Sequence, residues 1–315
     1  MDWWSSRLRS PTMESTKATP QGRIAAFLLL HHKDLPHCAS LGAHAMASNV
    51  TYTVTALLDV NPIQDIDDRA ESRSYIVADH DSGKAVIIDA VFENVDRDLK
   101  TIKELGFILT FAVETHIHAD HITGASMIKD RTGARIVYGG AVEGLVTGAD
   151  LFLHDGQELH FGSTTMKTLA TPGHTDSCTS YVLPGAVFTG DSLLIRGNGR
   201  TDFQGGSAEK LFDSVRKKLF VLPDETIVYP GHDYTGRVSS TIGEEKKFNE
   251  HLNLGVDKHT FVAIMNGKKI TRPAKMDIAL PANMNAGRMI WDEKGSNRGG
   301  TAFSSQTSII ESFDA

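Results

Sequence analysis

Hydrophobic and polar residues begin to follow a regular pattern close to residue 52. Residues 52–58 alternate between the two kinds and are rich in β-prone side chains, so we expect a strand there. Two short apolar runs, 74–78 and 85–89, flank a turn-rich Asp-His-Asp-Ser-Gly sequence and predict a β-hairpin. Similar short runs predict further strands at 108–113, 135–138, 158–161, 165–170, 180–183, 187–189 and 226–229.

Three segments have the spacing of helices. Residues 94–105 are followed by Gly106 and residues 121–131 by Gly133, and glycine is the residue that most often ends a helix. Ser207 is placed to cap a third helix that continues to residue 219. The apolar face of that helix is formed by Leu211, Phe212, Val215 and Leu219. Strands joined by turns and interspersed with helices predict an α/β sandwich with its helices outside.

The two ends of the chain differ from the part between them. Residues 1–49 are rich in Ser, Thr, Pro and His, and basic side chains outnumber acidic ones there, which predicts a disordered leader or a mitochondrial presequence. Residues 50–255 are expected to form the main folded domain, and residues 256–292 a short segment packed on its core. Residues 293–315 are rich in Ser, Gly and Thr and predict a disordered tail.

Composition narrows the classes of partner. The net charge is -7 and no basic run stands out, which argues against nucleic acid or an anionic membrane as a partner. No stretch approaches the roughly 20 apolar residues that a membrane span requires. Of the two cysteines, Cys38 and Cys178, neither has a CxxC partner, so we expect a reducing intracellular compartment. Cys178 is interpreted as a small buried side chain rather than a nucleophile.

One histidine cluster carries the strongest chemical signal. The sequence Thr-His-Ile-His-Ala-Asp-His at 115–121 directly follows a predicted strand and holds His116, His118, Asp120 and His121. Three imidazoles and a carboxylate are costly to bury without partners, although a solvated polar loop is the alternative. Converging imidazoles and carboxylates suit Zn, Fe, Mn or Ni, so the cluster predicts a metal site.

Three further residues occupy similar positions later in the chain. His174 and His232 each follow a strand and a Pro-Gly turn, and Asp191 follows a strand and a glycine. Loops at strand ends are where functional sites are usually built. A lone histidine is more often a structural hydrogen-bonding residue, but three such pieces behind an HxHxDH cluster favour a shared metal centre.

These motifs, in this order, resemble the metallo-β-lactamase superfamily over about residues 52–253. The resemblance implies an αββα sandwich with the metal site at one edge of its two sheets. It also implies His116, His118 and His174 as ligands of a first metal. Asp120, His121 and His232 would then serve a second metal, with Asp191 bridging.

Two stretches narrow the resemblance to the persulfide dioxygenases, the family of the ethylmalonic encephalopathy protein. They are Ile-Arg-Gly-Asn-Gly-Arg-Thr-Asp-Phe-Gln at 195–204 and Met-Asp-Ile-Ala-Leu-Pro-Ala-Asn-Met at 276–284. This family implies one Fe(II) per chain, bound by His116, His174 and Asp191, with positions left for water, substrate and O2. The reaction implied is oxidation of glutathione persulfide by O2 to sulfite and glutathione, a step of sulfide catabolism. Outer residues that orient the ligands would be His118, Asp120, His121, His232 and Asp176.

The same resemblance suggests residues that contact the substrate. Arg200 can grip a glutathione carboxylate, or it can pair with Asp202 and hold its own loop. Arg196 is a weaker candidate for the same contact, and Asp202 is counted with these two as a substrate-binding residue. Tyr234 can donate a hydrogen bond to a bound ligand and is counted with the catalytic residues, or it can simply pack. Asp176 can accept a hydrogen bond from an imidazole or cap a turn, and Asp233 has the same two alternatives.

The chain departs from the family at two positions. The family often has a cysteine where this chain has Asn198, and Cys-Gly where it has Ala286-Gly287. These departures put redox regulation at those positions in doubt, but not the metal ligands. A homodimer is expected from the resemblance. The presequence-like N-terminus predicts the mitochondrial matrix as the compartment if the organism is eukaryotic, and the cytoplasm is expected otherwise.

The main alternative is a two-metal thioester hydrolase of the glyoxalase II type. Every ligand for two Zn, Fe or Mn ions is present, and such an enzyme would hydrolyse S-lactoylglutathione. The Gly-Arg-Thr-Asp-Phe-Gln sequence and the short region after residue 253 argue against it. A scaffold retained only for binding is a third alternative, which the intact ligand set disfavours.

Overall fold

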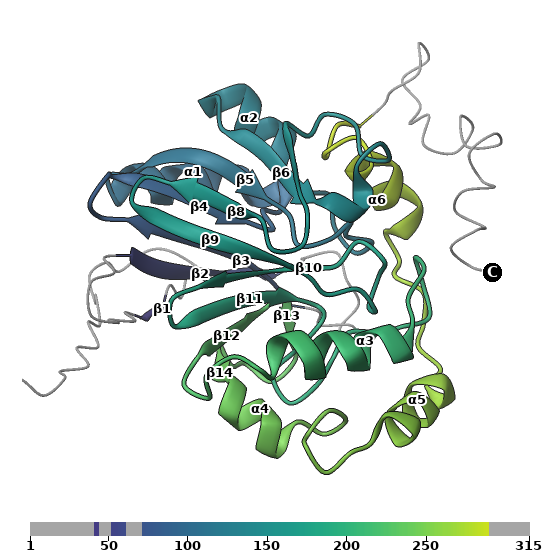
Figure 1. Cartoon of the computed structure of the whole chain (residues 1–315). Helices are drawn as coiled ribbons and strands as arrows, with labels where there is room; N and C mark the ends of the chain where they lie inside the picture. The colour runs from purple at the N-terminus through teal and green to yellow at the C-terminus, as the bar shows by residue number, and fades with distance from the viewer. Residues whose placement is uncertain (1–40, 44–51, 61–70, 290–315) are drawn as a thin grey trace, which may run out of the picture.

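The computed structural model describes residues 41–43, 52–60 and 71–289 (Figure 1). The predicted disordered tail at 293–315, and most of the predicted leader at 1–49, lie outside these residues. Within the residues of the predicted leader, the structure describes β1 (Leu41–Ala43), which pairs antiparallel with the next strand.

Two sheets form the centre of the molecule. The first has the strand order β1-β2-β3-β4-β5-β6-β7, with β13 pairing with β3. Its remaining strands are β2 (Tyr52–Val60), β3 (Glu71–Asp79), β4 (Lys84–Ile88), β5 (Ile108–Val113), β6 (Arg135–Gly139), β7 (Leu151–Leu153) and β13 (His232–Asp233). The second sheet has the order β14-β12-β11-β10-β9-β8. Its strands are β8 (Glu158–Phe161), β9 (Thr164–Ala170), β10 (Thr179–Leu183), β11 (Ala186–Gly190), β12 (Ile227–Pro230) and β14 (Ser240–Thr241).

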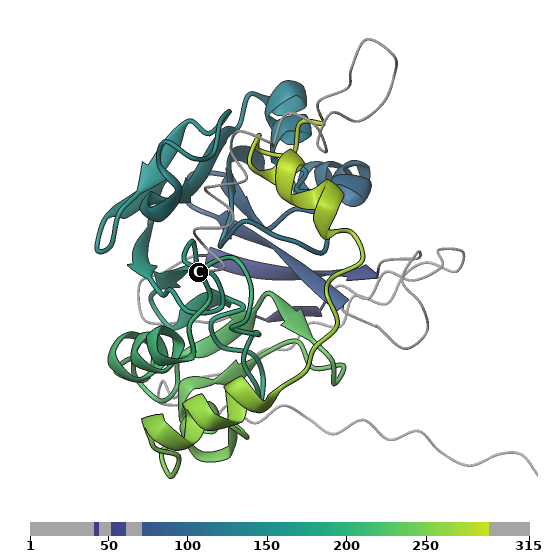
Figure 2. The same ribbon diagram turned by 90° about the vertical axis from the view of Figure 1, so that its right-hand side faces the viewer.

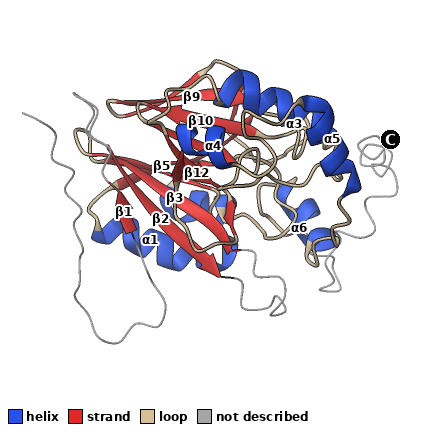
Figure 3. Cartoon of the chain, turned by 90° about the horizontal axis from the view of Figure 1, so that it is seen from below, coloured by secondary structure: helices blue, strands red, loops and turns tan. Residues whose placement is uncertain are grey.

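Helices cover the outer face of each sheet (Figure 3). They are α1 (Val95–Glu104), α2 (Ala125–Thr132), α3 (Ala208–Ser214), α4 (Ile242–Phe248), α5 (Lys258–Gly267) and α6 (Met276–Asn283). Helices α1, α2 and α6 lie on the side of the first sheet, and α3, α4 and α5 on the side of the second (Figures 1 and 2). The predicted αββα sandwich is confirmed.

Three layers of apolar side chains hold the sandwich together. In β4, Ile87 faces the helices on the first sheet, whereas Val86 and Ile88 face the second sheet. Because side chains alternate along a strand, residues 85–88 of this strand contribute to two layers, and all four are apolar and buried. The third layer lies between the second sheet and its helices, and Phe261 of α5 is fully buried in it.

Most of the predicted elements are confirmed, and the hairpin of β3 and β4 has the expected antiparallel register. Helix 121–131 is an exception, because α2 begins only at Ala125. Residues 121–124 instead form an irregular segment in which Thr123 makes an isolated bridge to Val91. The helix from Ser207 is capped as predicted, since the side chain of Ser207 accepts a hydrogen bond from the Lys210 N–H. It widens to a π-helical turn after Ser214.

The topology brings the candidate residues to one edge of the sandwich. The histidine cluster follows β5, Asp191 follows β11, and His232 follows β12. Strands β11 and β12 are parallel neighbours, so the loops after them emerge together. His174 lies in the loop between β9 and β10, in the same sheet.

A glycine before His174 allows its loop to touch a helix. Gly173 has a φ of +143°, and a Cβ there would lie 2.3 Å from the backbone nitrogen and Cα of Leu211. We predict that Gly173→Ala lowers the free energy of unfolding by about 2 kcal/mol, because the new methyl group collides with backbone atoms that cannot move aside. Urea denaturation measures this change.

Gly267→Ala is the matched control, because a Cβ at Gly267 would have no atom within 4 Å. We expect this variant to change the free energy of unfolding by less than about 0.5 kcal/mol. Equal stability of the two variants would contradict the close approach of α3 to the His174 loop.

Candidate metal centre

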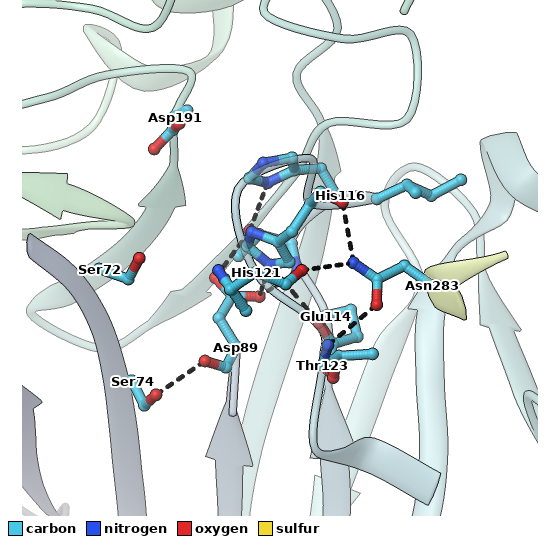
Figure 4. Close-up of polar contacts among 12 residues, drawn as sticks. Ser72, Ser74, Asp89, Glu114, His116, His121, Thr123, Asp191 and Asn283 are labelled. Carbon is cyan, nitrogen blue, oxygen red and sulfur yellow. Dashed lines mark hydrogen bonds and ion pairs between the residues drawn. The ribbon is translucent and has the colours of Figure 1, made fainter. Parts of the chain in front are cut away.

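Three side chains converge at the edge of the sandwich. Each of His116, His174 and Asp191 offers one ligand atom, and these atoms all lie within 4.8 Å of one another. His116 and Asp191 are buried and His174 is nearly so. Figure 4 shows His116 and Asp191 on separate loops that face the same space. The family resemblance implied these three residues as ligands of one metal, and their side chains are close together in the structure.

The tautomer of His174 follows from its backbone partner. Its Nδ1 lies 2.8 Å from the carbonyl oxygen of Arg200, which can only accept a hydrogen bond. The proton therefore resides on Nδ1, and Nε2 carries the lone pair. This Nε2 lies 3.5 Å from Oδ2 of Asp191.

The tautomer of His116 follows from a relay through a threonine. The Thr115 hydroxyl lies 2.7 Å from Oδ2 of Asp89 and 3.0 Å from Nδ1 of His116. A hydroxyl has one hydrogen, and Thr115 must donate it to the carboxylate. The hydroxyl then accepts from Nδ1–H of His116, which leaves the lone pair of His116 on Nε2.

The pKa shifts of His116, His174 and Asp191 also suit metal binding. Burial lowers the pKa of His116 well below its usual value, and the neighbouring His118 and His174 lower it further. Burial likewise lowers the pKa of His174. Burial by itself would raise the pKa of Asp191, but His232 outweighs it through charge and hydrogen bonding, so that the pKa lies well below its usual value. Two neutral imidazoles and one ionised carboxylate are the donor set that a divalent transition metal takes.

His232 links this group to a second carboxylate. Its Nδ1 lies 2.8 Å from Oδ1 of Asp191, and its Nε2 lies 3.2 Å from Oδ2 of Asp120. Although burial favours the neutral ring, the two carboxylates raise the pKa of His232 well above its usual value. Oδ2 of Asp120 also lies 2.9 Å from Nδ1 of His121 and 3.1 Å from the Ser72 hydroxyl. His121, Asp120 and His232 therefore form a hydrogen-bonded chain that ends on Asp191.

His118 faces a separate pair of buried carboxylates. Its Nε2 lies 3.2 Å from Oδ1 of Asp89 and 3.5 Å from Oε2 of Glu114. Burial lowers the pKa of His118, but Asp89 and then Glu114 outweigh it and raise the pKa well above its usual value. Sequence reasoning did not single out Asp89 or Glu114 as site residues. The signal that could have identified them is an acidic residue directly after an apolar strand. Asp89 follows β4 and Glu114 follows β5, and both side chains are buried.

A cavity of about 360 Å³ opens at the metal group. A volume of this size suits a small-molecule ligand. His116, His174 and Asp191 line it together with Tyr234, which lies parallel to the His232 ring at a centroid distance of 6.3 Å. The rest of the wall comes from Ala119, Asp120 and His232, from the 194–204 loop, and from the 270–273 link between α5 and α6.

The three candidates for substrate binding are engaged with protein groups. Arg200 forms a bidentate pair with Asp202 at 2.6 and 2.7 Å and donates to the carbonyl oxygens of Thr271 and Ile270. Four of its five guanidinium N–H groups are therefore used within the chain. Of the two alternatives for Arg200, the geometry supports the one in which it holds its loop. Arg196 pairs with Glu244 and Glu245 and does not line the cavity.

Two predicted imidazole partners lie elsewhere. The Asp176 carboxylate accepts a hydrogen bond from Nζ of Lys210 at 2.6 Å, so the prediction that it orients an imidazole is wrong. Asp233 accepts hydrogen bonds from Thr235 and from the Arg237 N–H, as a turn-capping residue does. Burial raises the pKa of the Cys178 thiol to about 12, which agrees with a buried, unreactive side chain.

The chain is similar to known proteins in sequence and in fold. Residues 68–232 match the sequence model of the Metallo-beta-lactamase superfamily. The human protein named persulfide dioxygenase ETHE1, mitochondrial, is 44% identical over 219 residues, which cover 68% of this chain and 84% of the human protein. A crystal structure of ETHE1 from Myxococcus xanthus matches with a TM-score of 0.67 and 45% identity, covering 69% of this chain and 95% of that chain.

A relative of another class matches over a shorter stretch. A hydroxyacylglutathione hydrolase from Brucella anthropi is 38% identical over 169 residues, which cover 53% of this chain and 63% of that protein. The similarity to the dioxygenases is therefore both higher and longer. Among the described residues, no helix combines the length and apolarity that a bilayer span requires.

The Arg200 contacts generate a stability prediction. Arg200→Lys keeps the charge but cannot grip Asp202 and two carbonyl oxygens at once, so we predict a loss of about 2 kcal/mol in the free energy of unfolding. Arg272→Lys is the control, because Arg272 pairs with Asp277 at an exposed site, and its loss should stay below about 0.5 kcal/mol. Chemical denaturation compares the two, and equal losses would argue against Arg200 as the residue that fixes the cavity wall.

Proposed function

The chain belongs to the metallo-beta-lactamase superfamily and is an enzyme, and on this premise we propose that it is an Fe(II)-dependent persulfide dioxygenase. The main support is that the imidazoles of His116 and His174, both neutral, and the ionised carboxylate of Asp191 converge on one point. Two histidines and a carboxylate are the donor set of non-haem Fe(II) oxygenases. Bound there, iron would supply the redox chemistry with O2 that zinc cannot, because zinc does not change its oxidation state.

The substrate proposed is glutathione persulfide. The terminal sulfur of the persulfide loses four electrons to O2, and with one water molecule the products are glutathione, sulfite and two protons. The similarity to proteins named persulfide dioxygenase supports this choice of substrate class. A mitochondrial location, which is part of the names of the human, bovine and murine relatives, belongs to the same proposal.

The chain's own residues would bind and orient the reactants. The Arg200 carbonyl and the Thr115 hydroxyl hold Nε2 of His174 and His116 toward the metal position. His232 holds the carboxylate of Asp191 by hydrogen bonding to it. Leu194 and Phe203 contribute an apolar wall that limits water around the reacting sulfur.

One metal is favoured over two by the contacts of His232. Both of its ring nitrogens face carboxylate oxygens, so neither offers a lone pair to a second metal in this arrangement. One observation favours the alternative, a two-metal thioester hydrolase acting on S-lactoylglutathione. The buried Nε2 of His121 has no hydrogen-bond partner within the described part of the chain, and a second metal would provide one.

Oxygen uptake tests the proposed reaction. We predict that the protein loaded anaerobically with Fe(II) consumes O2 and forms sulfite when glutathione persulfide is added, whereas the zinc-loaded protein does neither. An oxygen electrode and a sulfite assay measure both quantities. Hydrolysis of S-lactoylglutathione without O2 uptake would overturn the proposal in favour of the hydrolase.

Metal counting tests the number of ions. We predict one iron per chain in the wild-type protein and in His121→Ala, because His121 would act only through Asp120, and a loss of metal in His116→Ala. Elemental analysis after anaerobic loading and desalting measures the ratio. A drop from two metals to one in His121→Ala would instead support the two-metal hydrolase.

A further inference from the structure

The loop that carries the histidine cluster is buried but has no regular secondary structure. Residues 114–124 lie between β5 and α2, and most of their side chains are buried. Backbone polar groups in such a loop need partners, because an unpaired buried N–H or C=O is destabilising. At the start of the loop, the Thr115 N–H donates to Asp89, and the Ile117 N–H donates to the Ser177 hydroxyl.

One side chain from α6 forms hydrogen bonds with backbone groups in the second half of this loop. Nδ2 of Asn283, at the end of α6, donates to the carbonyl oxygens of His118 and His121, each at 2.8 Å. Its Oδ1 accepts from the Thr123 N–H at 2.9 Å. Asn283 is 1% exposed, and Figure 4 shows its amide directed into the loop. Both amide hydrogens and the amide oxygen are therefore used on three backbone groups of one loop.

We propose that Asn283 is a positioning residue of the metal centre, an inference that rests on the metal-dependent function proposed above. Asn283 touches none of the three proposed ligands. It acts on the backbone of His118 and His121, and so fixes where the side chains of this half-loop lie. The stretch that holds Asn283 also lies outside the residues matched by the superfamily model, which end at 232.

A continuous chain of hydrogen bonds leads from Asn283 to a ligand. Asn283 binds the His121 carbonyl, and Nδ1 of His121 lies 2.9 Å from Oδ2 of Asp120. That carboxylate oxygen lies 3.2 Å from Nε2 of His232, whose Nδ1 binds Asp191. A displacement of the His121 backbone therefore moves Asp120 and His232, and with them the orientation of the Asp191 carboxylate.

The helix that carries Asn283 is itself fixed against the same loop. The carbonyl oxygen of Ala286 accepts hydrogen bonds from the N–H and the hydroxyl of Ser126, at the start of α2. A Cβ added at Gly287, whose φ is +86°, would lie 2.1 Å from the carbonyl oxygen of Thr123. Met276 and Leu280 of α6 are buried in the layer that also holds α1 and α2. The position of the Asn283 amide is thus determined by packing on both sides of it.

Metal affinity separates a positioning role from simple anchoring of a helix. Asn283→Asp keeps the shape of the side chain but places carboxylate oxygen against two carbonyl oxygens. We expect its dissociation constant for Co(II) to rise by about 10- to 100-fold, as is typical when an outer partner of a metal site is lost. The visible absorption of bound Co(II) should also change, because it reports the arrangement of the ligands. Titrations of the full chain, followed by absorption, measure both quantities.

Two control variants make the comparison specific. Asn285→Ala removes the half-buried amide two residues away, which contacts Thr147, and should leave the affinity for Co(II) and the Co(II) spectrum unchanged. Phe261→Leu destabilises the protein at a buried position in the other helical layer, and should lower the melting temperature without weakening Co(II) binding. If Asn283→Asp does not fold, Asn283→Ser replaces it, since a hydroxyl can donate to only one of the two carbonyls.

The outcomes distinguish this inference from the proposed function. Weaker Co(II) binding in the Asn283 variant, with wild-type binding in both controls, supports it. Wild-type affinity and spectrum in the Asn283 variant would overturn the positioning role while leaving the metal site intact. Failure of the wild-type chain to bind Co(II) would instead overturn the metal-dependent function itself.

Discussion

A buried imidazole serves as a metal ligand only if its proton sits on the nitrogen that faces away from the metal. In this protein the proton of His174 is fixed by the Arg200 carbonyl, and that of His116 by the relay from Thr115 to Asp89. Thr115 and Asp89 are buried, so water does not take the place of this relay. The other residues at this edge of the sandwich keep the hydrogen bonds of His174 and His116 in place.

That requirement explains why loops from both sheets take part. Asp89 follows β4 of the first sheet, and Asp191 follows β11 of the second, so the centre exists only when the two sheets are packed together. Residues 85–88 of β4, which are apolar and contribute to two layers of the core, therefore also support the Asp89 relay. Hydrophobic packing, which is not directional, sets the distance between the sheets, and the hydrogen bonds then set the angles of the ligands.

The sequence predicted what is encoded locally. The strands, the cap at Ser207 and the order of the His and Asp motifs depend on neighbours in the chain, so their pattern is visible without a structure. The predicted start of α2 was wrong, because residues 121–124 are not helical. In this segment the Thr123 N–H binds the side chain of Asn283, which lies 160 positions away in the sequence. The pairings of Asp176 with Lys210 and of Arg200 with the 270–271 carbonyls are tertiary in the same sense, and residue type alone could not choose between the alternatives for either side chain.

We propose that one metal ion is held by His116, His174 and Asp191, with His118, His121 and His232 acting around it. The most direct test is a crystal structure of the protein loaded anaerobically with Fe(II), with anomalous diffraction recorded at the iron edge. We predict a single anomalous peak within bonding distance of Nε2 of both histidines and one carboxylate oxygen of Asp191. A second peak of similar height, bound by Asp120, His121 and His232, would contradict the one-metal centre and identify a binuclear site.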